Sequence, residues 1–296
     1  MISIRLKGRL GNQLFIYCVA RAISVKYNQD VTIIHNSESK FPCSLYGYCL
    51  NDRIKIIDEK KPVKGSLYKK FYFVFDRLVS MRFSPRKLHE FQLRNMERNL
   101  KHGFFFFNDG YYPLPEKVID NTFFDGYFQC DKFFDFIKDD LIQELIPIEE
   151  HTLSEKEIMY QIDNSESVCL TIRLGDFLNN PTHEVCTIDY FIQAMERMVE
   201  LVPNCKFFVF SDDINMVKKI FNFKRPVVFD DGKSKDYMSL DVMSHCKHFI
   251  ISNSSFSWWA QYLSNYNEKI VISPSRWYAQ DIPCDIMQDN WIKIDC

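Results

Sequence analysis

The amino-acid sequence predicts an α/β protein with two domains that contain parallel sheets wrapped by helices. In the second half, short apolar runs alternate with amphipathic stretches, the order expected of parallel strands and crossover helices. The N-terminus starts in the same way, with an apolar strand, a glycine-containing loop and a helix. The chain has 296 residues, enough for two domains of ordinary size.

The first domain is expected to span residues 1–155. Apolar residues at alternate positions in 2–6 predict a strand, residues 14–27 predict a helix, and residues 31–34 predict a second strand. The intervening loop holds Gly8 and Gly11 but matches neither a GxGxxG motif nor a Walker loop. A ligand-binding loop and a plain tight turn explain it equally well.

The second domain is expected to span residues 156–296, after a charged, helix-like stretch that Pro147 interrupts. Apolar runs predict strands at residues 168–172, 207–210, 227–229, 249–251 and 270–272. Helices are predicted at residues 188–201, 213–221, 237–245 and 256–263, the first with Thr187 as its N-cap. Ligands of such sheets bind beyond the carboxyl ends of the strands, so polar residues that follow a strand are candidate site residues.

Composition narrows the possible functions. The net charge of −2 does not favour nucleic acid as a partner. No N-terminal stretch reads as a signal peptide, and no window reaches the roughly 20 apolar residues of a membrane span. The 10 cysteines form no CxxC pair and no zinc-type cluster, which favours free thiols in a cytoplasmic protein.

Residues 55–102 form a basic region. They hold 13 Lys and Arg against 5 Asp and Glu, an excess of +8, and they mix these cations with aromatic and aliphatic residues. One interpretation is a helix on an anionic surface, a peripheral contact with the cytoplasmic face of the inner membrane. The other, which we prefer from the sequence, is a helix of the first domain with a solvated basic face.

Three strand ends of the second domain carry groups suited to a nucleoside diphosphate. Arg173 can bond a diphosphate bidentately, although an ion pair with Asp176 would explain it too. Asp212 and Asp213 can accept hydrogen bonds from a ribose or a base, and either can instead cap a helix. Ser252–Ser255 lead into a helix whose first N–H groups favour an anion, with plain N-capping as the alternative.

The aromatic stretch at residues 123–136 is the remaining candidate for ligand contact. Tyr127 and Gln129 can face a sugar, and they can equally be core or turn residues.

Five stretches in order, GRLGNQLFIY, DGYFQCDKFF, IRLGDF, FSDDI and NSSFSWWAQYL, resemble bacterial α-1,2-fucosyltransferases of glycosyltransferase family 11. The similarity spans nearly the whole chain, except about residues 36–120. It implies the GT-B arrangement, in which two Rossmann-like domains face a cleft. It also implies inverting, metal-independent transfer of fucose from GDP-fucose to the 2-hydroxyl of a galactose, with no cofactor. The acceptor would be an O-antigen or capsule glycan or a free β-galactoside.

The resemblance also implies roles for single residues. Arg173 would hold the β-phosphate and stabilise the departing GDP, and Ser254 and Ser255 would donate hydrogen bonds to the phosphates. The other implied donor-binding residues are Gly11, Asn12, Gln13, Asp212, Asp213, Asn253, Phe256 and Ser257. We expect Asp176 to be the general base. The candidate acceptor residues are Tyr127, Gln129, His183, Glu184 and Trp259, of which His183 and Glu184 are also alternative bases.

One motif departs from the family pattern. The family usually has His-x-Arg-Arg-x-Asp, whereas this chain has Thr171 and Leu174 in place of the histidine and the second arginine. The arginine that the chemistry needs most, Arg173, is kept, so an active enzyme is the first interpretation. The alternatives are a fucosyltransferase of another linkage and a non-catalytic nucleotide-binding protein of polysaccharide assembly.

Overall fold

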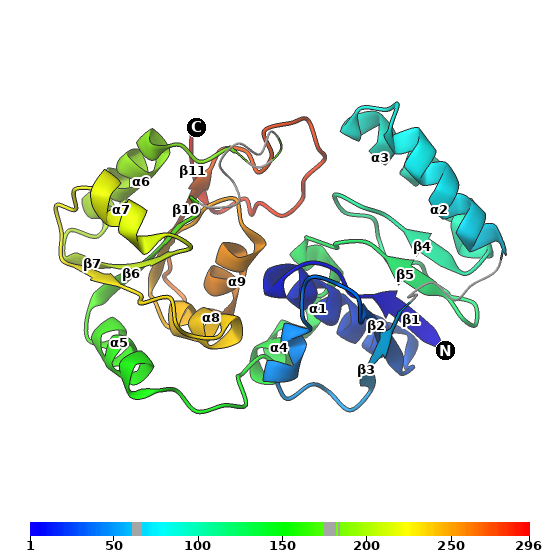
Figure 1. The fold of residues 1–296 in the computed structure, drawn as a ribbon, viewed down its shortest axis with the longest axis horizontal. Helices are drawn as coiled ribbons and strands as arrows, with labels where there is room; N and C mark the ends of the chain where they lie inside the picture. The colour runs from blue at the N-terminus through cyan, green and yellow to red at the C-terminus, as the bar shows by residue number, and fades with distance from the viewer. Residues whose placement is uncertain (61–66, 175–181, 183) are drawn as a thin grey trace. The chain divides into compact units, whose positions relative to one another are not determined.

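The computed structural model describes residues 1–60, 67–174, 182 and 184–296, which divide into two compact α/β units (Figure 1). The first unit comprises Met1–Ile146 and Asp281–Ile286, and the second comprises Pro147–Gln280 and Met287–Cys296. Two α/β units with parallel sheets confirm the predicted fold class. None of the described helices is long and apolar enough to cross a membrane.

The first unit is built on a five-stranded parallel sheet with the strand order β3-β2-β1-β5-β4. Its strands are β1 (Ile2–Arg5), β2 (Val31–Asn36), β3 (Ile54–Glu59), β4 (Phe104–Phe106) and β5 (Phe123–Asp125). The last three were not predicted. Two of them are only three residues long, too short to show a period, and β3 mixes charged residues with apolar ones.

The helices of the first unit cover both faces of its sheet (Figure 1). They are α1 (Leu10–Tyr27), α2 (Leu67–Ser80), α3 (Pro85–Lys101) and α4 (Lys138–Glu144), with 3-10 turns at Ser44–Gly47, Asp131–Phe133 and Asp135–Ile137. Helix α1 is buried along most of its length. It is tied to α4 because Arg21 Nη2 lies 2.7 Å from Glu144 Oε1 and the Tyr17 hydroxyl donates to Glu144 Oε2 at 2.5 Å.

The second unit is built on a six-stranded parallel sheet with the order β11-β10-β9-β6-β7-β8. Its strands are β6 (Glu166–Ile172), β7 (Cys205–Ser211), β8 (Val227–Phe229), β9 (His248–Ile250), β10 (Val271–Pro274) and β11 (Ile292–Ile294). The first five were predicted to within two residues at either end. The sixth, β11, was missed.

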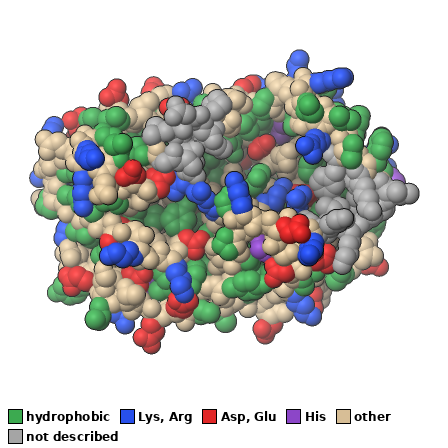
Figure 2. Space-filling model, in the orientation of Figure 1, with side chains coloured by type: hydrophobic (Ala, Val, Ile, Leu, Met, Phe, Trp, Pro, Cys, Tyr) green, Lys and Arg blue, Asp and Glu red, His purple; other side chains and the backbone are tan. Residues whose placement is uncertain are grey.

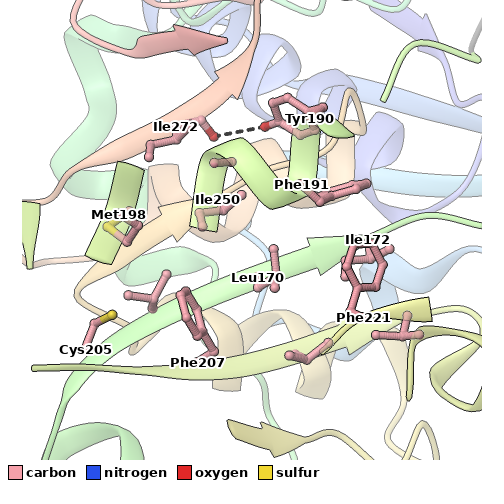
Figure 3. Close-up of a cluster of buried hydrophobic side chains, with 14 of the residues drawn as sticks. Leu170, Ile172, Tyr190, Phe191, Met198, Cys205, Phe207, Phe221, Ile250 and Ile272 are labelled. Atoms are coloured by element: carbon pink, nitrogen blue, oxygen red, sulfur yellow. Dashed lines mark hydrogen bonds between the residues drawn. The ribbon is translucent and has the colours of Figure 1, made fainter. Parts of the chain in front are cut away.

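Helices lie on both faces of this second sheet, α6 and α7 on one and α5, α8 and α9 on the other (Figure 1). They are α5 (Leu153–Asp163), α6 (Ile188–Leu201), α7 (Ile214–Ile220), α8 (Asp236–Ser244) and α9 (Ser255–Leu263). Under α6, Leu170 and Ile250 of the sheet lie in one buried cluster with Tyr190 and Phe191 (Figure 3). The Tyr190 hydroxyl donates to the Ile251 carbonyl at 2.6 Å, which ties α6 to the residue that follows β9. Thr187 caps α6, as predicted, because its side chain accepts from the Tyr190 N–H.

The boundary between the units falls between Ile146 and Pro147, earlier than the predicted position after residue 155. Helix α5 packs on β6 and α8, so it belongs to the second unit. The segment Asp281–Ile286 belongs to the first unit instead, where the Asp285 carboxylate accepts from the Tyr111 N–H at 2.8 Å. A short segment that returns to the first unit late in the chain has no distinctive composition, so the sequence did not predict it.

Several cysteines are plain core residues, as predicted. Cys18, Cys169, Cys205 and Cys246 are buried free thiols. Burial raises the pKa of Cys169 and of Cys18 well above the ordinary thiol range, so these two remain protonated.

Each sheet has one point where its strand order reverses. In the first unit this point lies between β1 and β5, and in the second it lies between β6 and β9. The chain leaves the first strand of each unit in one direction and returns on its other side. Open parallel sheets bind ligands at this position, beyond the carboxyl ends of the two strands.

Candidate functional site

The switch point of the second unit brings Arg173 and the serine turn to the same edge of one sheet. Strands β6 and β9 are hydrogen-bonded neighbours with Leu170 opposite Ile250. Arg173 directly follows β6, and Ser252–Ser255 follow β9 and lead into α9. Because the strands are parallel, both groups extend from their carboxyl ends. The structure thus places these two candidate groups at neighbouring strand ends of one sheet, and their joint contact with a pyrophosphate stays a prediction.

The serine turn is held in place by buried hydrogen bonds. The Thr171 hydroxyl accepts from the Ser252 N–H at 3.2 Å, which links the end of β6 to the turn. The Ser252 and Ser257 hydroxyls are 3.1 Å apart, and the Asn253 amide donates to the Trp277 carbonyl at 3.0 Å. Thr171, Ser252, Asn253 and Ser257 are all buried. The polar groups of these residues hold the turn in shape. Thr171, which stands where the family usually has a histidine, therefore anchors the turn to β6.

Ser254 stands at the N-cap of α9 but does not act as an ordinary cap. Within the described part of the chain, its side chain makes no capping hydrogen bond, although its backbone carbonyl accepts from the Trp258 N–H at 2.9 Å. The N–H groups of the first helical turn have no partner inside a helix, and the helix dipole makes this end positive. The Ser254 hydroxyl is thus placed beside backbone donors at an anion-favouring helix start.

Arg173 is positioned by Asp212 of the neighbouring strand end. The Arg173 Nε atom lies 3.5 Å from Asp212 Oδ2, and Asp212 Oδ1 accepts from the Leu174 N–H at 2.9 Å. Both charged side chains are 22% exposed. The Leu174 side chain packs against the core, so this residue supports the turn and its side chain contributes no charge. Asp212 therefore orients the guanidinium of Arg173. The sequence analysis did not identify Asp212 as the partner of Arg173.

Of the other predicted donor-binding residues of this unit, one caps a helix and two are partly exposed. The Asp213 carboxylate caps α7 by accepting from the Met216 N–H at 2.9 Å, which confirms the capping interpretation for one of the two aspartates. Ser255 and Phe256 are partly exposed in the first turn of α9. A contact of Asp212 or Asp213 with guanosine stays a prediction.

Trp259 corrects one acceptor assignment. It is fully buried in α9, and its ring lies 5.0 Å from Trp258 and 5.3 Å from Tyr262 between ring centroids. A ring enclosed in this way does not reach a sugar, so the assignment of Trp259 to the acceptor is wrong.

In the first unit, α1 begins earlier than predicted and takes the glycine-loop residues into its first turn. Gly11, Asn12 and Gln13 all lie within α1. The buried Gln13 amide donates to the Gly8 and Pro42 carbonyls at 2.9 and 2.7 Å, and its oxygen accepts from the Ser44 N–H at 2.8 Å. The Gln13 amide is therefore engaged in bracing two loops, which corrects its assignment as a direct donor contact.

The switch point of the first unit holds a buried carboxylate between two cations. Asp125 ends β5, with Oδ2 3.3 Å from Arg5 Nη1 and Oδ1 2.5 Å from Lys7 Nζ. The sequence analysis did not select any of these three residues. A charged residue at the end of an aromatic strand, in the stretch FFDG, is the signal that could have identified Asp125.

The two predicted acceptor residues of this unit lie directly after Asp125. Lys7 Nζ is 4.8 Å from the centre of the Tyr127 ring, and the Gln129 amide donates to Asn12 Oδ1 at 2.7 Å. Phe128 between them has φ 54°, a left-handed conformation that costs a bulky residue roughly 1–2 kcal/mol. Residues held in strained backbone cluster at functional sites, which supports a ligand role for this turn.

Two further carboxylates surround this position. Burial raises the pKa of Asp109 to about 6, with the Lys7 charge opposing the rise. Burial likewise raises the pKa of Asp76, which accepts from the Gln92 amide at 3.1 Å. Asp109 and Asp76 thus add acidic groups close enough to Lys7 for its charge to act on their pKa values.

Three predicted residues remain without a structural test. Asp176 and His183 lie outside the described residues, and Glu184 is exposed in the segment before α6. Among the residues that the structure describes, no group of three or more His, Cys, Asp or Glu side chains is arranged to hold a metal ion. Independence from a metal stays a prediction.

Two doubly wound units with parallel sheets give the chain a GT-B-like fold. Comparison with known proteins gives the family. The family profile described as Glycosyl transferase family 11 matches residues 1–295, so the chain belongs to this family.

Two relatives match nearly the whole chain, and a third matches about half of it. It is 27% identical to the Escherichia coli O-antigen biosynthesis glycosyltransferase WbnK, over 98% of this chain and 99% of WbnK. It is 29% identical to an Escherichia coli alpha-1,2-colitosyltransferase, over 100% of this chain and 99% of that protein. A Caenorhabditis elegans galactoside 2-alpha-L-fucosyltransferase is 28% identical over 49% of this chain and 43% of its own length.

Among solved structures, the fucosyltransferase NodZ from Bradyrhizobium has the same fold. Its TM-score is 0.51, with 9% identity over 88% of this chain and 92% of NodZ. At this identity the likeness concerns the fold alone.

Proposed function

We propose that this enzyme transfers fucose from GDP-fucose to the 2-hydroxyl of a galactose residue in a glycan. The observation that carries the proposal is the placement of Arg173 and the Ser252–Ser255 turn at the ends of the adjacent strands β6 and β9. A guanidinium and a helix start on one edge suit a pyrophosphate, which presents several oxygens to both.

The chemistry that follows is a single displacement with inversion at the fucose C1. As the acceptor oxygen attacks, the bond from C1 to the β-phosphate oxygen breaks and negative charge collects on GDP. Arg173, oriented by Asp212, and the first N–H groups of α9 neutralise that charge without having to reorganise. This preorganised positive charge supplies the stabilisation for which other transferases use a metal ion.

The first unit takes the acceptor in this proposal, and the second takes the donor. Arg5 and Lys7 share the buried Asp125 carboxylate, and Asp76 and Asp109 add further acid, so a neutral polyhydroxyl ligand suits the position better than a phosphate. The half-buried Tyr127 ring offers an apolar face, and Gln129, whose amide donates to Asn12, is partly exposed two residues further on. Asp176 is proposed as the base that removes the proton from the attacking hydroxyl.

A second donor is favoured by a particular relative. The alpha-1,2-colitosyltransferase matches the whole chain at 29% identity. Colitose differs from fucose in lacking the hydroxyl at C3, so the same phosphate site and the same acceptor hydroxyl would serve both sugars. The acceptor is proposed to be an O-antigen-type glycan or a free β-galactoside, in keeping with the O-antigen role named for WbnK.

The test is a transfer assay on the purified chain with EDTA present. GDP-fucose and a colitosyl donor are each supplied with a panel of galactose-terminated glycans, and the product linkage is read by NMR. We expect fucose on the galactose 2-hydroxyl, and far slower transfer by an Arg173→Ala variant of unchanged melting temperature. A product of another linkage, transfer of colitose alone, or GDP binding without turnover would each overturn the proposed activity.

A further inference from the structure

Helix α2 turns an apolar stripe away from the protein. Phe71, Val74, Phe75 and Leu78 recur at the i, i+3, i+4, i+7 spacing, so they lie on one face of the helix. All four are exposed, and Phe71 is 70% exposed. A helix that covers a sheet ordinarily buries a stripe of this kind.

The opposite face of α2 attaches the helix to its unit. The buried Tyr72 ring packs edge-on against Phe104 and Phe106, with centroids 5.5 and 5.7 Å away. The buried Asp76 carboxylate accepts from the Gln92 amide of α3 at 3.1 Å. The helix is therefore seated by its tyrosine and aspartate, and the apolar stripe faces outward as a consequence.

The stripe continues into the turn that joins α2 to α3. Phe71 stacks on Phe75 with centroids 6.2 Å apart, and Phe91 of α3 lies 5.7 Å from Phe75 and 6.3 Å from Phe83. We call the exposed members the aromatic patch, which comprises Phe71, Val74, Phe75, Leu78, Met81 and Phe83. These six side chains form one group within 13 consecutive residues, unlike the exposed apolar residues scattered elsewhere.

The segment that carries the aromatic patch is rich in basic residues. Residues 67–101 contain nine Lys and Arg against three Asp and Glu, a net +6 in a chain of net −2. One of the three acids, Asp76, is buried. Arg77, Arg82, Lys87 and Arg98 are exposed. Figure 2 shows hydrophobic and basic side chains together where Figure 1 draws α2 and α3.

We propose that the aromatic patch docks on the surface of an anionic lipid bilayer, with α2 parallel to it. An apolar helix face with basic neighbours is what interfacial helices use, the rings entering the acyl boundary and the cations reaching anionic headgroups. A second copy of the chain is a poorer occupant, because a symmetric contact would bring two +6 surfaces together. This inference does not depend on which sugar the enzyme transfers.

The experiment compares vesicle binding of the full chain with that of matched variants. Vesicles of phosphatidylcholine alone and with 30% phosphatidylglycerol are sedimented with the protein at low and high salt. Phe71→Asp removes one patch residue, and Phe136→Asp changes a phenylalanine of similar exposure, 61%, elsewhere in the same unit. Arg77→Glu and Lys117→Glu form the second matched pair, both exposed residues of the first unit.

The proposal predicts strong binding to the anionic vesicles, weakened at least tenfold by Phe71→Asp and by Arg77→Glu but by neither control. High salt weakens it as well. Melting temperature and transfer to a soluble acceptor stay unchanged in all four variants. The proposal is overturned if the wild type binds both vesicle types equally. It is also overturned if the Phe71→Asp variant binds anionic vesicles as well as the wild type does. A chain that ignores vesicles but sediments as a dimer that Phe71→Asp dissociates shows instead that the patch is a protein interface.

Discussion

The two units place different chemistry at the same point of similar sheets. At the β6–β9 switch point, Arg173 lies beside the Asp212 carboxylate, and the serine turn leads into the start of α9. At the β1–β5 switch point, Arg5 and Lys7 are paired with the buried Asp125, and Asp76 and Asp109 add further acid. The second site adds the backbone N–H donors of a helix start to its ion pair, whereas the first site adds further carboxylates to its own. Charge balance, more than fold, therefore distinguishes a phosphate site from a sugar site.

The largest expected effect comes from removing the cation of the second site. Arg173→Ala should lower kcat by about 10²–10³-fold, the range for loss of one preorganised transition-state contact. Arg173→Lys should recover part of the rate, because a lysine keeps the charge without the bidentate fork. Steady-state kinetics with melting curves as a folding check measure this. A near-normal kcat for Arg173→Ala would contradict the assignment of the β6–β9 switch point as the phosphate site.

A stability measurement sharpens the account of the first site. The folded pKa of Asp109 is about 6 against an ordinary 3.8, so the native chain binds more protons than the unfolded chain between these values. The free energy of unfolding therefore falls as pH rises through this window. Asp109→Asn has no carboxylate to ionise, so it does not lose stability in this window. Above pH 6 its free energy of unfolding should exceed that of the wild type by up to about 3 kcal/mol. Denaturant titrations at pH 4 and pH 7 test this, and a constant difference between the two proteins contradicts it.

Thr171 tests whether the serine turn needs its anchor to β6. Thr171→Val keeps the shape of the side chain but leaves the buried Ser252 N–H without its acceptor. We expect a loss of about 1–3 kcal/mol in the free energy of unfolding and a higher KM for the donor. Ser167→Ala, a buried hydroxyl in the same strand that accepts from the Lys247 N–H, is the control and should leave KM unchanged. An unchanged donor KM in Thr171→Val would show that the turn keeps its shape without this bond.

The smallest expected effects separate a binding serine from a capping threonine. Ser254→Ala should weaken donor binding about tenfold with little change in melting temperature, because the Ser254 hydroxyl makes no capping bond within the described residues. Thr152 caps α5 in a full capping box with Glu155. Thr152→Ala should therefore cost about 1 kcal/mol of stability with donor KM unchanged. The reverse pattern would make Ser254 an ordinary cap.

The sequence predicts the second unit better than the first for a physical reason. Five strands of the second unit are apolar runs separated by amphipathic helices, and the turn at Ser254 and the arginine at 173 follow such runs directly. In the first unit, β4 and β5 are three residues long and β3 is partly charged, so no period marks them. Partnerships between distant residues, such as Asp212 with Arg173 or Asp125 with Lys7, depend on strand order, which local pattern does not encode. The sequence also does not show which candidate contact residues are buried. Gln13 and Trp259 were predicted to contact a ligand, and both are buried within the protein.

The most direct test of the pyrophosphate assignment is calorimetric binding of GDP to three proteins, the wild type, Arg173→Ala and Asp125→Asn. The account predicts that Arg173→Ala binds GDP at least tenfold more weakly, while Asp125→Asn, altered only at the switch point of the first unit, binds it like the wild type. GDP affinity that is unchanged in Arg173→Ala, or lost in Asp125→Asn, would contradict the placement of the donor at the β6–β9 switch point.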